Sequence, residues 1–218
     1  WVGIAKDAGM EYVVITTKHQ DGFCLWDSAL TDFDMMSTPF RRDIMKELAD
    51  ACHRQGIRIG WYYSILDWHH SDYLPRRDGD TRSTQDGDYN LYIDYMKDQL
   101  CELLTKYGTI DVLWFDGGRE HKPEEHRAWE VVDFVRSMQP DIIINDGLGV
   151  PGDYHTIEQS LPAAGVPNRD WELAMTINNS WGYNRTDQNW KSAQVLMDTF
   201  DDVTQKGGNV LLNVGPTS

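Results

Sequence analysis

The segment IDVLWFDGG, residues 110–118, is the stretch of sequence that most directly indicates the fold. Its apolar beginning predicts a short buried strand, which Asp116 follows directly. Gly117 and Gly118 then allow the backbone to turn without crowding. Residues with helical spacing precede and follow the segment, and a strand between two helices is typical of a parallel sheet.

The same alternation of strand and helix runs along the whole chain. Short apolar, β-branched runs predict strands, and apolar residues at i, i+3 and i+4 spacing predict helices. Predicted strands lie at residues 12–17, 57–64, 110–115, 141–145, 171–177 and 209–214, and predicted helices at 1–8, 41–55, 89–107, 123–138 and 190–206. Strand, loop and helix repeated in this order indicate an α/β fold built on a parallel sheet.

Two architectures fit this order: a doubly wound open sheet and a (β/α)8, TIM-type barrel. The loops after strands are long and rich in Trp, His and Asp, whereas the loops after helices are short and contain glycine. This asymmetry favours a barrel whose strand ends carry the site. A dinucleotide-binding fold is disfavoured, because no G-x-G-x-x-G segment lies between a predicted strand and a predicted helix. We expect residues 1–218 to be one catalytic barrel segment, truncated at both ends, because the chain opens within a helical pattern and stops just past a strand. Six strands are recognisable, so one or two strands of the barrel remain unassigned.

The composition restricts the classes of partner. A formal net charge of −15 repels phosphate backbones and disfavours nucleic acid, and no apolar run reaches the roughly 20 residues of a membrane helix. The three cysteines lack a C-x-x-C spacing, so a zinc site is not expected. His69 and His70 lie near Asp67 and Asp72 without further ligand spacing, and we expect neither a metal nor another cofactor.

Aromatic and polar side chains gather where the predicted strands end. A flat ring packs on the apolar face of a pyranose while carboxylates and imidazoles bind its hydroxyls, so this pattern favours a sugar site. Asp116 is the strongest candidate for chemistry, because alternation along the strand places it on the same face as Trp114. Capping the next helix is the alternative role for Asp116.

A retaining glycosidase needs a second carboxyl group about 5–5.5 Å from the first. The candidates are Glu120, Glu124, Glu125, Glu158 and Glu172. Glu124 and Glu125 are expected at a helix start, where acids favour the helix dipole, and Glu120 is expected on a loop surface. Glu158 is expected in a long loop past a strand end, from which it can reach inward.

Five segments in one order resemble the α-L-fucosidases of glycoside hydrolase family 29, across essentially the whole chain. They are KHQDGFCLWDS (18–28), GWYYSILDWHHSDY (60–73), DVLWFDG (111–117), SWGYN (180–184) and KGGNVLLNVGP (206–216). The resemblance implies an irregular (β/α)8-like barrel, here incomplete at the N-terminus and lacking the family's C-terminal β-sandwich. It also implies a retaining, metal-independent exo-glycosidase that removes terminal α-L-fucosyl residues from glycans.

The resemblance also implies roles for individual residues. Asp116 matches the nucleophile and Glu158 the acid/base. The residues that the resemblance places on the sugar are His19, Gln20, Trp26, Tyr63, Trp114 and Trp181. Gln20 stands where the family often has a second histidine, Tyr63 matches a tyrosine near the nucleophile, and Trp181 matches an aromatic residue that faces the C5 methyl of fucose.

The sequence departs from the family pattern after one strand. Asn145-Asp146-Gly147-Leu148-Gly149 lacks the arginine of the family's Asn-Asp-Arg-Trp-Gly segment, so a sugar contact or a carboxylate pairing must be made differently. Other activities remain open: hydrolysis of a different α-linked sugar, sugar binding without catalysis, and a nucleotide-dependent reaction. The last is disfavoured, because no G-x-G-x-x-G segment connects a predicted strand to a predicted helix. The expected partner is a fucosylated oligosaccharide or glycoconjugate, and the family implies a secreted, periplasmic or lysosomal location.

Overall fold

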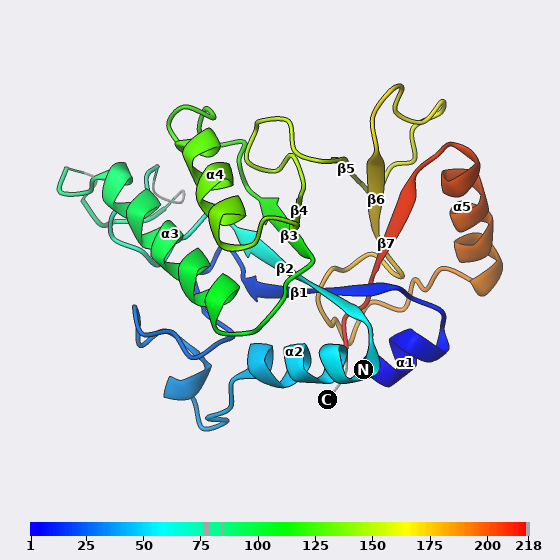
Figure 1. Cartoon of the computed structure of the whole chain (residues 1–218), viewed down its shortest axis with the longest axis horizontal. Coiled ribbons are helices and arrows are strands. Elements are labelled where there is room, and N and C mark those ends of the chain that lie inside the picture. Colours follow the sequence, from blue (N-terminus) through cyan, green and yellow to red (C-terminus); the bar gives the residue numbers. More distant parts are fainter. Residues whose placement is uncertain (76–78, 84, 217–218) are drawn as a thin grey trace. The chain divides into compact units, whose positions relative to one another are not determined.

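The structure is a computed structural model and describes residues 1–75, 79–83 and 85–216 (Figure 1). The chain divides into two compact units, unit 1 from Trp1 to Val150 and unit 2 from Pro151 to Ser218. Unit 1 contains helices α1 (Val2–Asp7), α2 (Ile44–Gln55), α3 (Tyr89–Thr105) and α4 (Ala128–Met138), the 3-10 turn η1 (Met35–Ser37), and strands β1 (Tyr12–Lys18), β2 (Arg58–Ser64), β3 (Val112–Asp116) and β4 (Ile143–Ile144). Unit 2 contains strands β5 (His155–Glu158), β6 (Trp171–Thr176) and β7 (Asn209–Asn213) and helix α5 (Ala193–Gln205).

The sheet of unit 1 is parallel, with the strand order β1-β2-β3-β4. Because its strands run in one direction, their carboxyl ends meet at one edge. Tyr62 of β2 lies beside Trp114 of β3, and Ser64 lies beside Asp116. Asp116 therefore ends its strand at this carboxyl edge.

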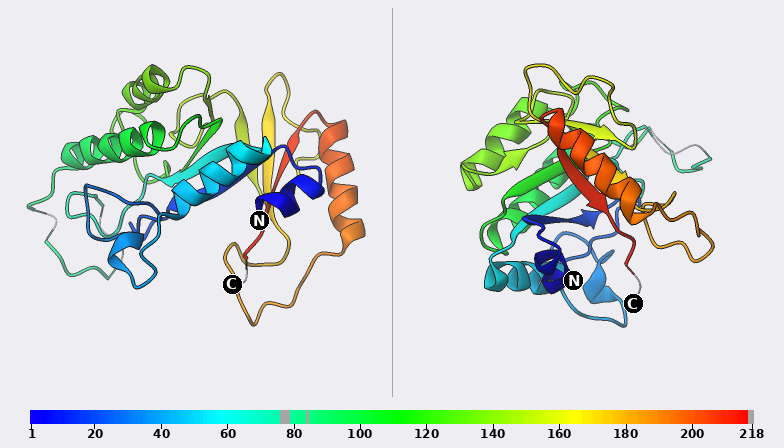
Figure 2. Two further views of the ribbon diagram at one scale, coloured as in Figure 1. Left: turned by 60° about the horizontal axis from the view of Figure 1, so that its bottom comes forward. Right: turned by 90° about the vertical axis from the view of Figure 1, so that its right-hand side faces the viewer.

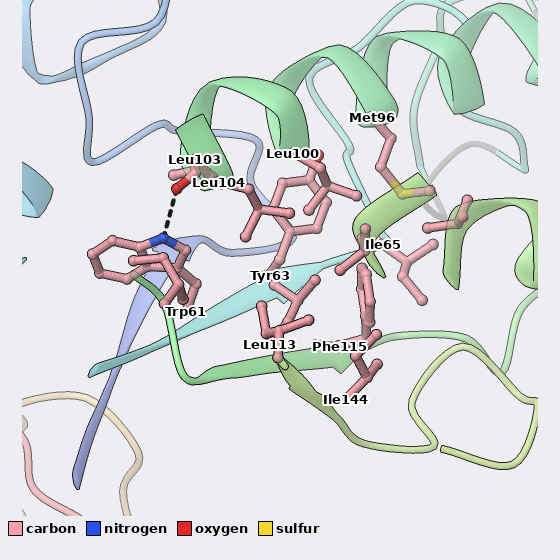
Figure 3. Packing of buried hydrophobic residues seen from close by; sticks show 14 of the residues in the cluster. Trp61, Tyr63, Ile65, Met96, Leu100, Leu103, Leu104, Leu113, Phe115 and Ile144 are labelled. Atoms are coloured by element: carbon pink, nitrogen blue, oxygen red, sulfur yellow. Dashed lines mark hydrogen bonds between the residues drawn. The ribbon is translucent and has the colours of Figure 1, made fainter. Parts of the chain in front are cut away.

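The helices of unit 1 cover one face of this sheet. Alternate residues of β2 and β3, including Trp61, Tyr63, Leu113 and Phe115, pack with apolar residues of α2, α3 and α4 in one buried cluster. Figure 3 shows the part of this cluster that lies against α3. The Trp61 indole N–H also donates to the Leu103 carbonyl oxygen of α3 at 2.9 Å. The strand residues that alternate with this set consequently face away from the helices.

Local sequence sets the helix ends. Asp43, Asp88 and Ser192 cap α2, α3 and α5, and each side chain accepts a backbone N–H of the first turn. Helix α4 starts later than the sequence predicts, because Arg127 adopts a left-handed conformation, with φ of 51°, directly before it.

Unit 2 is a second parallel sheet, with the order β5-β6-β7. Trp171, Leu173 and Met175 of β6 pack with Val203 of α5, which lies along β7 (Figure 2). The prediction that Glu158 lies in a long loop is wrong, because Glu158 is the last residue of strand β5. With only 4 residues, β5 is too short to produce a recognisable period.

The predicted α/β fold with parallel sheets is confirmed in each unit. Closure of the two sheets into a (β/α)8-like barrel, with residues 1–218 as one domain, stays a prediction. Among the helices of the described ranges, none has both the length and the apolar character needed to cross a membrane.

Candidate active site

The carboxyl edge of the unit 1 sheet carries aromatic and polar side chains on the face away from the helices. Tyr62 and Trp114 stack with their ring centroids 5.3 Å apart, and the His19 ring stacks on Tyr62 at 5.8 Å. Asp116 ends β3 beside them. We call His19, Tyr62, Trp114 and Asp116 the strand-end cluster. Trp114 is buried, Tyr62 and Asp116 are half-buried and His19 is exposed, so the cluster opens outward from a covered base.

Asp116 has hydrogen bonds to both carboxylate oxygens. The Tyr62 hydroxyl donates to Oδ2 at 2.6 Å, and the Gly117 backbone N–H donates to Oδ1 at 2.6 Å. Its backbone carbonyl accepts the Ile65 N–H at 2.8 Å, which ties the end of β3 to the end of β2. The alternative role of helix cap is wrong, because the N-cap of the next helix is Arg127. The carboxylate is thus held in one orientation while its side chain stays partly accessible.

Two glycines let the loops after β3 and β4 pack backbone against backbone. A Cβ on Gly147 would lie 1.9 Å from the Phe115 carbonyl oxygen, and a Cβ on Gly118 would lie 2.2 Å from the Gly147 carbonyl oxygen. The Asn145 side chain fixes the same contact, because it accepts the Phe115 N–H at 2.8 Å and donates to the Phe115 carbonyl at 2.9 Å. No side chain fits at position 147 unless the backbone moves, so this backbone excludes the arginine of the family pattern.

Glu158, the predicted acid/base, ends β5 in unit 2. The ladder pairs it with Ala174 of β6, and the next backbone N–H, from Gln159, donates to the Ala174 carbonyl at 2.9 Å. Its neighbour Ile157 packs against the α5 side of the sheet, so alternation turns Glu158 to the opposite face. The exposed carboxylate therefore projects from an ordered strand at the carboxyl edge of unit 2.

Three of the other candidates for a second carboxylate have structural partners. Glu172 starts β6, is 4% exposed and accepts the Asn209 side-chain amide at 3.0 Å. Glu120 accepts the Tyr73 hydroxyl at 2.5 Å, and Glu125 accepts a backbone N–H of its own loop at 2.7 Å. These contacts give each of the three carboxylates a structural role, so none of them needs a role in catalysis to explain its position.

Trp181 lies in the loop after β6, and its side chain is exposed. The backbone of this loop packs against the residues that follow β7, because a Cβ on Gly215 would lie 2.6 Å from the Tyr183 nitrogen. Since β5, β6 and β7 are parallel, this loop and Glu158 belong to the same edge of the unit 2 sheet.

Two predicted sugar-binding residues lie in the core of unit 1. Trp26 is fully buried and its indole N–H donates to Glu102 at 2.8 Å. Tyr63 is fully buried, its hydroxyl donates to Gln99 at 2.6 Å, and burial raises its pKa well above the usual value. The tyrosine beside the candidate nucleophile is Tyr62, which the sequence analysis missed. The signal that identifies Tyr62 is its position directly opposite Trp114 in the pairing of β2 with β3.

Gln20 lies in the turn that follows His19, and its backbone carbonyl accepts the Trp68 N–H at 2.8 Å. The paired histidines lie nearby: His69 is exposed, and the His70 ring packs on Tyr95 with centroids 4.3 Å apart. Within residues 1–75, 79–83 and 85–216, no group of three His, Cys, Asp or Glu side chains is arranged to hold a metal ion.

A sequence profile of the family described as Alpha-L-fucosidase matches residues 1–218. The tissue alpha-L-fucosidase of Bos taurus is 30% identical over 234 residues, which cover 100% of this chain and 48% of that protein. Alpha-L-fucosidase 1 of Arabidopsis thaliana is 38% identical over 250 residues, which cover 100% of this chain and 47% of that protein. The chain thus spans about half the length of the curated relatives it matches.

Solved structures share the same fold. Alpha-L-fucosidase isoenzyme 1 from Paenibacillus thiaminolyticus has a TM-score of 0.94 and 43% identity, with 100% of this chain and 57% of that chain covered. Alpha-L-fucosidase AlfC from Lactobacillus casei, in complex with its alpha-L-fucose product, has a TM-score of 0.87 and 33% identity, with 98% and 70% covered. Because the profile matches from the first residue to the last and the fold agrees with these structures, the chain belongs to the α-L-fucosidase family.

Proposed function

We propose that the protein is a retaining α-L-fucosidase that hydrolyses terminal α-L-fucosyl residues of glycans. The observation that carries the proposal is the Asp116 carboxylate, held by Tyr62 and Gly117 beside the ring faces of His19 and Trp114. A carboxylate oriented by two donors is suited to attack a sugar that packs against neighbouring rings. Family membership supports the same activity.

The proposed reaction proceeds in two displacements. In the first, Asp116 forms a bond to C1 of the fucoside, the bond from C1 to the leaving oxygen breaks, and the Glu158 carboxylic acid gives its proton to that oxygen. In the second, the Glu158 carboxylate takes a proton from water, the water oxygen bonds to C1, and Asp116 leaves as a carboxylate. Both groups return to their starting protonation states, and one glycosidic bond has been hydrolysed.

This reaction requires the two carboxyl groups to face each other about 5–5.5 Å apart. The proposal therefore includes the (β/α)8-like barrel that the sequence predicts. No metal or other cofactor takes part in the proposed steps.

The proposed sugar-binding set comprises His19, Gln20, Trp114 and Trp181. His19 and Gln20 offer hydrogen bonds to sugar hydroxyls, and the two tryptophans offer ring faces. The set omits Trp26 and Tyr63, because both side chains are fully buried in the core of unit 1. The proposed substrate is a fucosylated oligosaccharide or glycoconjugate, in keeping with a secreted, periplasmic or lysosomal location.

Azide rescue on aryl α-L-fucosides tests the two carboxylate roles separately. Asp116→Gly should lose hydrolysis and, with azide, release β-fucosyl azide, because azide then attacks the intact substrate directly. Glu158→Ala should form the fucosyl-enzyme from substrates with good leaving groups and, with azide, release α-fucosyl azide, because azide then attacks the covalent intermediate. The anomeric configuration of the product therefore identifies each role.

A matched variant controls for the loss of a carboxylate charge elsewhere in unit 1. Asp111→Asn changes a carboxylate just before β3 that accepts the Ile59 N–H at 3.0 Å, and it should keep full activity. Undiminished turnover by Asp116→Gly would contradict the assignment of the nucleophile. Turnover of another aryl α-glycoside, with none of the fucoside, would favour a different sugar. Fucose binding without any turnover would favour a binding protein.

A further inference from the structure

A buried ion pair between Lys18 and Asp67 lies next to the strand-end cluster and takes no part in the proposed reaction. The Lys18 Nζ lies 2.9 Å from Asp67 Oδ2, and the two side chains are 0% and 2% exposed. Burial disfavours the charged amine, but the attraction of Asp67 outweighs burial and raises the pKa of Lys18. Replacing a buried ion pair by apolar residues is often neutral or stabilising, so stability alone does not explain this pair.

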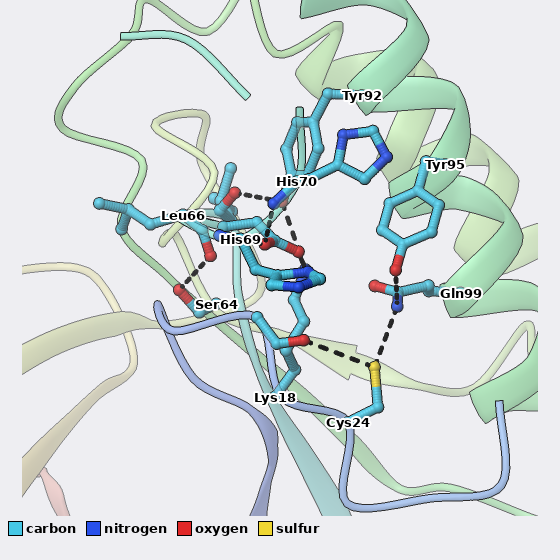
Figure 4. A network of polar contacts seen from close by, with 12 residues as sticks. Lys18, Cys24, Ser64, Leu66, His69, His70, Tyr92, Tyr95 and Gln99 are labelled. Atoms are coloured by element: carbon cyan, nitrogen blue, oxygen red, sulfur yellow. Dashed lines mark hydrogen bonds and ion pairs between the residues drawn. The ribbon is translucent and has the colours of Figure 1, made fainter. Parts of the chain in front are cut away.

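The pair joins the end of β1 to the loop after β2. Asp67 Oδ1 accepts the backbone N–H groups of His69 and His70, at 3.1 and 2.9 Å. Lys18 also donates to the Tyr92 hydroxyl at 3.3 Å (Figure 4). Both charged groups thus have several partners, and these partners lie far from β1 in the sequence.

A β-bulge sets the direction of the residues at the end of β1. The regular register of β1 with β2 ends at Tyr62, and Lys18 then pairs with Tyr63, so β1 contains one extra residue. This residue, Thr17, is buried and donates its hydroxyl to the Tyr62 carbonyl oxygen at 2.7 Å. The bulge places Lys18 on the helix-covered face with Tyr63, so the next residue, His19, points to the opposite face.

The turn after His19 is held against the same loop. The Gln20 carbonyl accepts the Trp68 N–H at 2.8 Å. A Cβ on Gly22 would lie 2.3 Å from Asp67 Oδ1, so the turn and the carboxylate are in direct contact. The turn therefore keeps its place only while Asp67 keeps its own.

We propose that the Lys18–Asp67 pair is a positioning device that, together with the bulge, aims the His19 ring at Tyr62 and the sugar site. The Tyr62 ring contacts His19 and the Tyr62 hydroxyl binds Asp116, so a displacement at Lys18 reaches the candidate nucleophile through two contacts. The placement of His19 follows from the contacts above, whereas its consequence for catalysis rests on the proposed function.

The first test measures the placement of His19 without any sugar. The double variant Lys18→Met/Asp67→Asn keeps the approximate side-chain sizes and removes both charges. We expect the His19 imidazole proton resonances to move toward the positions of a solvent-exposed histidine, because the ring leaves the face of Tyr62. His19→Ala identifies these resonances by their disappearance. Unchanged His19 resonances in the folded double variant would overturn the proposal.

The second test measures coupling in a double-mutant cycle. We expect the double variant to lower kcat/KM on an aryl α-L-fucoside about 10- to 100-fold, because small misplacements of binding groups have effects of this size. When His19 is already alanine, the further loss should be less than about threefold, because the side chain to be positioned is gone. A purely structural pair would give equal losses in both backgrounds, and equal losses would overturn the proposal.

Glu102→Gln is the matched control, since Glu102 is a buried carboxylate on α3 of the same unit. Its effect should add to that of His19→Ala and leave the His19 resonances unmoved. If the double variant does not fold, Thr17→Val, which removes only the bulge hydroxyl, must show the same resonance shift and the same non-additivity for the proposal to stand. If the unaltered protein neither binds fucose nor hydrolyses fucosides, the proposed function fails, and the His19 resonances still decide the positioning.

Discussion

Replacing Gly147 by alanine should destabilise unit 1 and displace Asp116, because the Phe115 backbone lies directly against this position. The new Cβ would lie 1.9 Å from the Phe115 carbonyl oxygen, whereas real Cβ atoms essentially never come within 3.0 Å of another heavy atom. The loop after β4 must therefore move away from β3 by about 1 Å, since the interior is too closely packed to absorb the overlap.

The contacts across this loop set the size of the effect. The Asn145 side chain makes hydrogen bonds of 2.8 and 2.9 Å to the Phe115 backbone, and a movement of that size breaks at least one of them. A buried polar group left unpaired costs about 1–3 kcal/mol, and overpacking costs about 1–3 kcal/mol more. We expect the free energy of unfolding to fall by about 2–6 kcal/mol, a large part of the roughly 5–15 kcal/mol that stabilises a protein.

Urea denaturation measures this loss, and Gly182→Ala is the matched control, since a Cβ at Gly182 would meet nothing within 4 Å. The control should stay within about 0.5 kcal/mol of the unaltered protein. Because Asp116 directly follows Phe115, kcat/KM of Gly147→Ala on an aryl fucoside should also fall about 100-fold. A Gly147→Ala variant as stable and as active as Gly182→Ala would refute the reasoning.

Other substitutions test separate parts of the site. Tyr62→Phe should lower kcat/KM about 10- to 100-fold, because it keeps the stacked ring but removes one hydrogen bond to the Asp116 carboxylate, worth about 1.5–3 kcal/mol. Undiminished kcat/KM would show that the Tyr62 hydroxyl does not orient Asp116. Trp181→Ala should raise KM about threefold to tenfold and leave thermal stability unchanged, because the side chain is 43% exposed, whereas Trp190→Ala, 51% exposed, should change neither. Burial lowers the pKa of His126. The contribution of His126 to the free energy of unfolding is therefore complete above the unfolded pKa of about 6.5 and is lost as the pH falls through the folded value. In urea denaturation at neutral and acidic pH, the free energy of unfolding of His126→Gln should change less with pH than that of the unaltered protein.

Six of the seven strands in the described part of the chain could be predicted from sequence, and β5 could not. The predicted runs at 12–17, 57–64 and 171–177 correspond to β1, β2 and β6, because strands buried in a parallel sheet are almost continuously apolar. Strand β5 has one aliphatic residue, Ile157, and is defined by its pairing with β6, which no local pattern encodes.

Residue types located Asp116 but could not separate the neighbouring tyrosines. The sequence predicts Tyr63 beside the candidate nucleophile, whereas Tyr62 lies there, because only the register with β3 decides which of the two tyrosines faces Asp116. The burial of Lys18 could not be anticipated either, because its partner Asp67 is 49 positions away and the bulge that turns Lys18 inward has no sequence signature.

The place of Glu158 in a ladder has a consequence for engineering new leaving-group preferences. Pairing with Ala174 and the hydrogen bond from Gln159 hold the backbone on both sides of the proposed proton donor. In the connection that follows, residues 160–170, Leu161 and Val166 pack against the core of unit 2. Exposed positions of this connection, such as residues 163, 164, 167 and 168, tolerate changes of composition far better than the strands do. Directed evolution toward other aglycones should therefore begin in this connection, where large libraries leave the backbone contacts of Glu158 unchanged.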